Sequence, residues 1–137
     1  IAEAIAESSA RKIYVCNIMT QPGETTGYTA SDHLKAILDH TAPGLIDCVL
    51  VNTAPVDPEL LARYKAEGAE PVVMDTEALN ELGVSVAVGD LISQEDVVRH
   101  DSQRLARAVF RLALRSTLRQ GGRKFRRRLI RMKEIEL

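Results

Sequence analysis

Residues 12–28 read KIYVCNIMTQPGETTGY, and this stretch decides the fold that the sequence predicts. The first seven residues, 12–18, are apolar nearly throughout rather than alternating, which is typical of a central strand covered on both faces. A polar loop containing two glycines follows, and an amphipathic helix pattern begins near Thr29. A strand, a loop and a helix in this order indicate a unit of a parallel α/β fold.

The loop predicts a site for an anionic ligand. Loop amides and the first unpaired N–H groups of a helix attract negative charge. Gly23 permits a positive φ, and Pro22 stiffens the turn. The candidate ligand-binding residues of this loop are Thr20, Gln21, Gly23, Glu24 and Thr25. An ordinary Pro-Gly turn before a capped helix is the alternative, because neither Gly-x-x-x-x-Gly-Lys nor Gly-x-Gly-x-x-Gly is present.

Outside the loop, strands and helices alternate at short spacing. Apolar runs predict further strands at residues 48–52, 71–75 and 84–89, beside the first at 12–18. Helices are expected at the N-terminus, from about Thr29, from Asp57 as N-cap, over 76–82, and from Asp101 or Ser102 to about 119. A short turn is expected at 93–98. The sequence therefore predicts an α/β fold with a mainly parallel, Rossmann-like sheet, whose ligands gather at the carboxyl ends of the strands.

The last predicted helix carries two patterns. Its apolar stripe is formed by Leu105, Val109 and Leu112, and is expected to be reinforced by Ala106, Phe110 and Ala113. Arginines at three- and four-residue steps form a basic ridge on the same helix.

Charge is divided unevenly along the 137 residues, although the net charge is only −1. Residues 1–98 carry 5 Lys/Arg against 16 Asp/Glu, whereas residues 99–137 carry 13 against 3. The basic tail, residues 120–137, could bind nucleic acid or an anionic membrane, or could extend into solvent. Few aromatic residues interleave with its charges, so nucleic-acid binding is not favoured.

Both cysteines, Cys16 and Cys48, lie inside apolar runs, which is typical of core thiols in a reduced, cytoplasmic protein. The sequence shows no signal peptide and no apolar run long enough to span a membrane. Because the chain opens on Ile1 without a methionine and already reads as helix, we expect it to be a piece of a longer protein.

Other polar residues are weaker candidates. Arg99 precedes a helix start and could bind a phosphate, but from its position alone a salt bridge to one of the many carboxylates of residues 1–98 is the favoured explanation. Tyr64 lies on a core-facing helix, and His33 is interpreted as a partly buried structural histidine. The pair His100-Asp101 is interpreted as a hydrogen-bonded histidine beside a helix cap. No catalytic residue, metal site or cofactor is predicted.

A resemblance adds what these patterns do not give. The run Asn17 to Tyr28, followed by Ser31-Asp32-His33, resembles the YvcK-type gluconeogenesis factors of the CofD-like superfamily. The likeness continues through 47–52, Arg63-Tyr64, Pro71-Val72 and 99–101, and covers roughly residues 10–112. It implies that residues 1–119 are the C-terminal part of a CofD-like α/β domain, with the Gly-rich nucleotide loop in an N-terminal half.

The resemblance also implies a function. Members look like cytoplasmic bacterial regulators that bind UDP-N-acetylglucosamine and act in cell-shape and cell-wall precursor control during gluconeogenic growth. Binding positions carry over to Tyr64 and Arg99, and then to Thr20–Thr25; Ser102 stands where relatives often carry a phosphorylatable threonine. A protein partner in amino-sugar metabolism and a homo-oligomer would fit this role.

Two alternatives remain open. The first is a CofD-like transferase that moves a phospholactyl-type group from a nucleotide-activated donor to a deazaflavin. The second is a basic interaction module centred on the tail.

Overall fold

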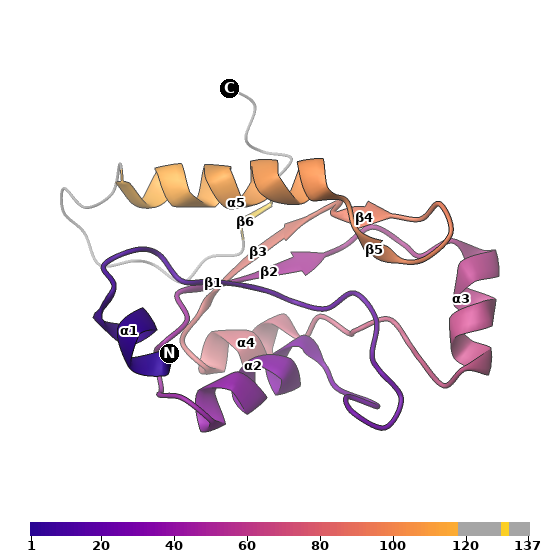
Figure 1. The fold of residues 1–137 in the computed structure, drawn as a ribbon, viewed down its shortest axis with the longest axis horizontal. Coiled ribbons are helices and arrows are strands. Elements are labelled where there is room, and N and C mark those ends of the chain that lie inside the picture. The colour runs from indigo at the N-terminus through magenta and orange to yellow at the C-terminus, as the bar shows by residue number, and fades with distance from the viewer. Residues whose placement is uncertain (118–129, 132–137) are drawn as a thin grey trace.

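A computed structural model describes residues 1–117 and 130–131 of the chain. A parallel sheet forms its centre, with strands β1 (Ile13–Val15), β2 (Cys48–Asn52) and β3 (Ser85–Gly89) side by side in that order (Figure 1). The two-residue strand β6 (Ile130–Arg131) pairs with β3 on the side away from β2, and this pairing is also parallel. The register places Tyr14 opposite Val49, and Val49 opposite Val86. The predicted α/β class with a parallel sheet is confirmed.

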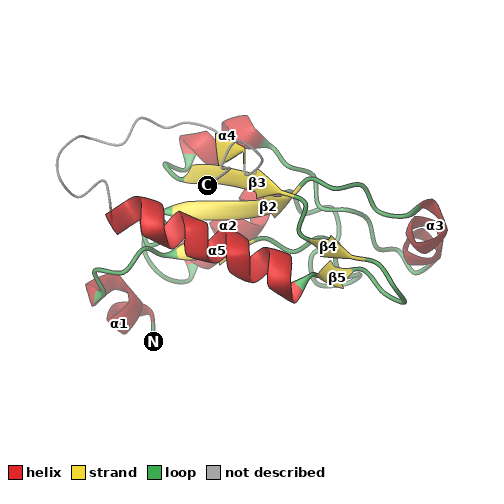
Figure 2. Cartoon of the chain, turned by 90° about the horizontal axis from the view of Figure 1, so that it is seen from above, coloured by secondary structure: helices red, strands yellow, loops and turns green. Residues whose placement is uncertain are grey.

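Helices cover both faces of the sheet. Helices α2 (Ala30–Asp39) and α4 (Thr76–Glu81) lie against one face, and α5 (Ser102–Thr117) lies across the other (Figures 1 and 2). Helix α3 (Pro58–Ala66) lies beyond the carboxyl ends of the strands, and α1 (Ala2–Glu7) lies near the opposite end. None of the helices in the described ranges is long and apolar enough to cross a membrane.

Strand β2 shows why these residues form a central strand. Val49 and Val51 face the core beneath α2 and α4, whereas Cys48 and Leu50 face the core beneath α5. Side chains of a strand alternate between its faces, so a strand with helices on both sides is apolar at every position. Both cysteines are buried and free, as the sequence predicts, and burial raises the pKa of the Cys16 thiol to about 11.

One of the predicted elements is wrong. Residues 71–75 are not a strand of the sheet: Pro71 makes a single antiparallel bridge with Met19, and the N–H of Val72 donates to Ile18 O at 2.9 Å. Parallel β3 occupies the place beside β2, so this segment packs outside the sheet. The expected turn at 93–98 is confirmed as the tip of a hairpin, whose strands β4 (Ile92–Ser93) and β5 (Arg99–His100) the sequence did not predict.

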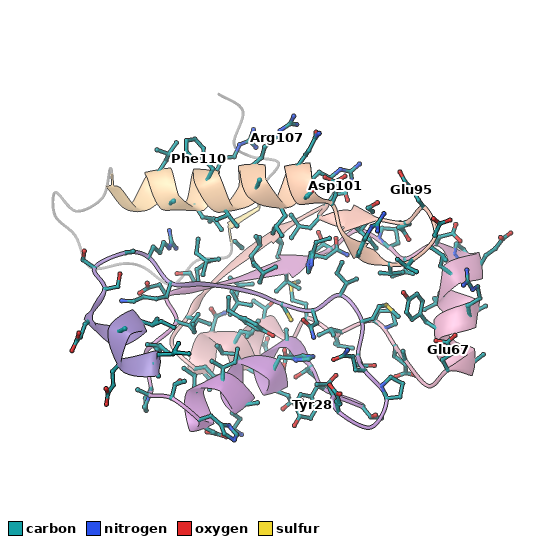
Figure 3. The ribbon with its side chains drawn as sticks, viewed as in Figure 1. Tyr28, Glu67, Glu95, Asp101, Arg107 and Phe110 are labelled. Atoms are coloured by element: carbon teal, nitrogen blue, oxygen red, sulfur yellow. The ribbon has the colours of Figure 1, made fainter. Side chains whose placement is uncertain are left out.

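One side of α5, which was expected to be buried, is exposed instead. Ala108 and Leu112 are buried against the sheet, with Leu105 and Val109 packed beside them. Phe110 is 64% exposed and points away from the sheet (Figure 3). The expected reinforcement of the stripe by Ala106, Phe110 and Ala113 is therefore wrong, because these three residues lie on the exposed side of the helix. The predicted basic tail falls mostly outside the described residues.

Candidate functional site

The predicted ligand loop is hydrogen-bonded to the segment that follows α3. Thr20 is buried, and its backbone N–H donates to Glu70 O at 2.7 Å while its hydroxyl accepts from the Glu70 N–H at 2.9 Å. A Cβ atom placed on Gly68 would lie 3.7 Å from Pro22 Cγ, so the proline lies over this glycine. Thr20 is therefore the residue that anchors the loop.

Within the loop, most amides already have acceptors. The Gln21 N–H donates to Thr25 Oγ1 at 2.8 Å, and the Thr25 N–H returns to Gln21 O at 2.9 Å. Gly23 has a φ of 79°, and its N–H donates to Thr26 Oγ1 at 3.1 Å. These bonds fix the backbone, as the interpretation of a stiff turn requires. The side chains of Gln21 and Glu24 lie at the exposed surface of the loop.

The start of α2 is closed rather than open to an anion. Thr29 and Asp32 form a capping box at the start of the helix. The Ala30 N–H donates to Val73 O, and the Ser31 N–H donates to Asp75 Oδ1 at 2.9 Å. Asp75 also accepts from the hydroxyls of Thr29 and Ser31. The expectation that the first N–H groups of this helix are free to bind an anionic ligand is therefore wrong, because the carboxylate of Asp75 already occupies the helix terminus.

The hydrogen bonds to Asp75 set its charge. Burial by itself would raise the pKa of this carboxyl, but the donors on Ser31 and Thr29 outweigh burial and lower the pKa below its ordinary value. Asp75 therefore stays ionised at neutral pH. Nothing in the local pattern of residues 29–33 signals this partner, which comes from a segment more than 40 residues away.

Tyr64 and the residue before Arg99 are joined directly. The Tyr64 hydroxyl accepts from the Val98 N–H at 3.1 Å, and its ring packs beside Ile18, Met19 and Ile92. Arg99, the next residue, has a largely exposed side chain whose Nη2 lies 3.9 Å from Glu95 Oε2. Exposed ion pairs at this separation hold a side chain weakly. The structure thus brings Tyr64 and Arg99, two predicted binding positions, close together through Val98.

Ser102 and the histidines have distinct surroundings. Asp101 rather than Ser102 caps α5, since its Oδ1 accepts from the Arg104 N–H at 2.8 Å; Ser102 is exposed in the first turn. His33 is buried, with the Tyr28 ring edge-on at 5.4 Å. Burial lowers the pKa of both His33 and His100, and the Nε2 atom of each is buried without a partner among the described residues.

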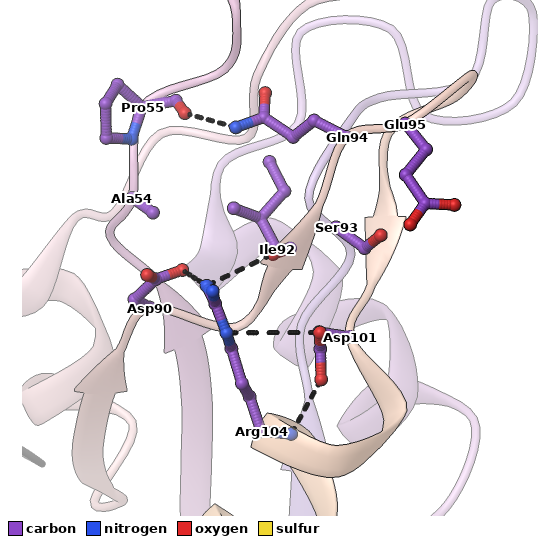
Figure 4. A pocket seen from close by; sticks show the side chains of 9 residues that line it. All are labelled: Ala54, Pro55, Asp90, Ile92, Ser93, Gln94, Glu95, Asp101 and Arg104. Atoms are coloured by element: carbon purple, nitrogen blue, oxygen red, sulfur yellow. Dashed lines mark hydrogen bonds and ion pairs between the residues drawn. The ribbon is translucent and has the colours of Figure 1, made fainter.

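A pocket of about 500 Å³ opens beside the hairpin, at the carboxyl ends of β2 and β3 (Figure 4). Arg104 reaches into it from α5, with Nη1 2.6 Å from Asp90 Oδ1 and Nε 3.9 Å from Asp101 Oδ2. The same Nη1 lies 3.4 Å from Ile92 O. The lining residues are Ala54, Pro55, Asp90, Ile92, Ser93, Gln94, Glu95, Asp101 and Arg104.

The sequence-based candidates did not include this pocket. Asp90 was recognisable as a polar residue at a strand end, which is where ligands of parallel sheets gather. The opposite wall is formed by the β4–β5 hairpin, of which the sequence predicted only the turn, so the wall residues could not be assigned. Within residues 1–117 and 130–131, no three His, Cys, Asp or Glu side chains form a group that could hold a metal ion.

Comparison with known proteins adds the family. Residues 1–92 match the family described as 2-phospho-L-lactate transferase CofD. The gluconeogenesis factor of Halalkalibacterium halodurans is 48% identical over 111 residues, which cover 80% of this chain and 34% of that protein. The gluconeogenesis factor of Bacillus subtilis strain 168 is 42% identical over 107 residues, covering 77% of this chain and 34% of that protein.

A solved structure agrees with the sequence relatives. The crystal structure of a UPF0052 family member from Bacillus halodurans superposes with a TM-score of 0.78 at 46% identity, over 80% of this chain and 36% of that one. The chain thus spans about a third of the length of the curated relatives it matches. By the family match over residues 1–92 and by its relatives, the chain belongs to the CofD family and, within it, to the YvcK-type gluconeogenesis factors.

Proposed function

We propose that the chain is part of a cytoplasmic bacterial regulatory protein that binds a nucleotide sugar, UDP-N-acetylglucosamine. In the longer protein, ligand binding would serve the control of cell shape and cell-wall precursors during gluconeogenic growth. The gluconeogenesis factors to which the chain is similar support the regulatory role. Residues 1–119 would form part of the binding domain, and 120–137 would form a basic extension. A partner protein in amino-sugar metabolism and self-association are compatible with this role.

The hydrogen bond between Tyr64 and Val98 is the observation that carries the proposal. It fixes a tyrosine beside the backbone that presents Arg99, at the end of the sheet where ligands of parallel α/β folds bind. A guanidinium can meet a diphosphate with two parallel hydrogen bonds, and the exposed, 3.9 Å pairing with Glu95 leaves Arg99 able to do so. Gln21 and Glu24 would complete the surface from the neighbouring loop, which Thr20 anchors to the segment that follows α3.

Calorimetric titration of the full-length protein with UDP-N-acetylglucosamine tests this assignment. Arg99→Lys keeps the charge but loses the planar fork, so affinity should fall about tenfold or more. Arg107→Lys, an exposed arginine on α5, is the matched control and should bind like the parent. Equal affinities for the parent and for Arg99→Lys would remove Arg99 from the site, and an absence of binding by the parent would refute the proposed ligand.

A CofD-like transferase is the second candidate, supported by the match of residues 1–92 to the transferase family. Incubation of the full-length protein with a guanylylated phospholactate donor and a deazaflavin acceptor decides between the two. Release of the nucleotide with formation of a phospholactyl-deazaflavin would favour the enzyme. Binding of UDP-N-acetylglucosamine without any turnover of either compound would favour the regulator.

A further inference from the structure

The pocket beside the β4–β5 hairpin is acidic. Asp90, Glu95 and Asp101 line it against a single guanidinium, that of Arg104, which two of these carboxylates already approach. A phosphate placed here would be repelled by three carboxylates. A hydroxyl group, in contrast, can donate to a carboxylate and accept from a guanidinium. The pocket therefore suits an uncharged group that carries several hydroxyls.

The polar groups of the pocket are held in place before any ligand binds. Arg104 is fixed by Asp90 at 2.6 Å and by Ile92 O at 3.4 Å, and Asp101 is fixed by its bond to the start of α5 (Figure 4). The opposite wall is also tied, because Gln94 Nε2 donates to Pro55 O at 3.1 Å. Little further ordering is needed on binding, which favours affinity. Buried Ile92 and the Ala54 methyl add an apolar surface for ring carbons.

Arg99 stands at the rim of this pocket. In the hairpin Arg99 is paired with Ser93, and paired residues of an antiparallel ribbon project from the same face. Ser93 lines the pocket, and so does Glu95, the residue whose carboxylate lies 3.9 Å from the Arg99 guanidinium. A ligand with its anionic part at Arg99 would therefore extend its neighbouring part into the acidic pocket.

We propose that the pocket lined by Asp90, Ser93, Asp101 and Arg104 holds a hydroxyl-bearing ring of the nucleotide sugar whose diphosphate binds at Arg99. This inference rests on the proposed function. The volume of the pocket, about 500 Å³, lies within the range of roughly 300–1,000 Å³ typical of small-molecule sites. The sugar and the ribose lie on either side of the diphosphate, so either ring can supply the hydroxyls. The two cases differ in their expected affinity for UDP, which contains the ribose but lacks the sugar.

Titration of full-length variants with UDP-N-acetylglucosamine and with UDP separates the cases. Asp90→Asn removes a charged acceptor with little change of shape and should weaken binding of the nucleotide sugar about tenfold or more. If the sugar occupies the pocket, affinity for UDP stays at the parent value. If the ribose occupies it, affinity for UDP falls by the same factor. The matched control is Asp96→Asn, an exposed hairpin carboxylate outside the pocket, which should bind like the parent.

A second variant keeps the test decisive if Asp90→Asn folds poorly. Ser93→Phe fills the pocket without altering its charge and should weaken binding of UDP-N-acetylglucosamine to a similar extent. Parent-like affinity in both pocket variants, or an equal loss in Asp96→Asn, would overturn the inference. If Arg99→Lys weakens binding while the pocket variants do not, the pocket assignment alone fails. If the parent does not bind the nucleotide sugar, the proposed function fails with it.

Discussion

The hydroxyl of Tyr64 accepts a hydrogen bond from the Val98 N–H at 3.1 Å, and this bond ties α3 to the β4–β5 hairpin. The tyrosine ring extends the same connection, because it packs against the apolar cluster of Ile18, Met19 and Ile92. Tyr64 thus positions the backbone next to Arg99 whether or not its own ring touches a ligand. Effects of Tyr64 variants on binding must therefore be separated from effects on the hairpin.

Tyr64→Phe should lower the free energy of unfolding by about 0.5–1.5 kcal/mol, because it leaves the half-buried Val98 N–H without its acceptor. Urea unfolding of the parent and the variant measures this difference. Tyr28→Phe, on the ligand loop, is the control and should change stability less. Equal stabilities for the parent and Tyr64→Phe would show that the bond to Val98 does not hold the hairpin.

Gly23 tests the rigidity of the ligand loop. Its φ of 79° lies in the left-handed region, and a Cβ atom there would meet nothing within 4 Å. The cost of Gly23→Val is therefore one of backbone strain, about 1–2 kcal/mol or somewhat more for a β-branched residue. Gly23→Asn, which tolerates this conformation, should retain most of the stability. Titration with UDP-N-acetylglucosamine should then show Gly23→Val as the weaker binder; equal affinities of the two variants would exclude a role for the loop's shape.

Helix α5 offers a matched pair of positions. Leu112 is fully buried against the sheet, whereas Phe110 is 64% exposed on the opposite side. Leu112→Ala should reduce the free energy of unfolding of this chain by about 2–5 kcal/mol. Phe110→Ala should change it by no more than about 0.5 kcal/mol. Urea unfolding checks both, and a larger loss at Phe110 than at Leu112 would mean that the helix faces the sheet by its other side.

The sequence predicted what depends on local pattern. The apolar run of β2, the helix start near Thr29 and the start of α3 at Asp57 were all confirmed, because each depends on residues a few positions apart. Residues 71–75 and Phe110 were assigned wrongly for one physical reason. Both are apolar and therefore look like parts of the core. Whether they are buried depends on which distant element packs beside them, and local sequence does not show this.

The same reason limited the candidate site. The pattern of the loop and α2 predicted free amides at a helix terminus, and it could not show that Asp75 would fill that position from another segment. The pocket around Arg104 depends on a hairpin whose strands are two residues each, too short to give a strand pattern. Arg99 and Tyr64 came from a family resemblance, and their closeness through Val98 became visible only in the structure.

Asp75 is the last test, because it replaces the ligand that the start of α2 was expected to bind. Asp75→Asn has nearly the same shape but removes a charged acceptor from the Ser31 N–H and from the hydroxyls of Thr29 and Ser31. Hydrogen bonds to a charged group contribute about 1.5–3 kcal/mol each, and the amide oxygen of asparagine retains part of this. We therefore expect a loss of about 1.5–3 kcal/mol in the free energy of unfolding at pH 7.

The dependence on pH gives the sharper result. The pKa of Asp75 is lower in the folded chain than its ordinary value of 3.8, so the carboxylate stabilises the fold fully above that value. This stabilisation is lost as the pH falls from about 3.8 through the lower, folded-state pKa. Urea unfolding between pH 7 and pH 2 should thus show the gap in unfolding free energy between the parent and Asp75→Asn narrowing at the acidic end. Asp96→Asn, an exposed carboxylate, should show no comparable gap at any pH. A gap that stays constant down to pH 2 would mean that Asp75 stabilises α2 by its shape and not by its charge.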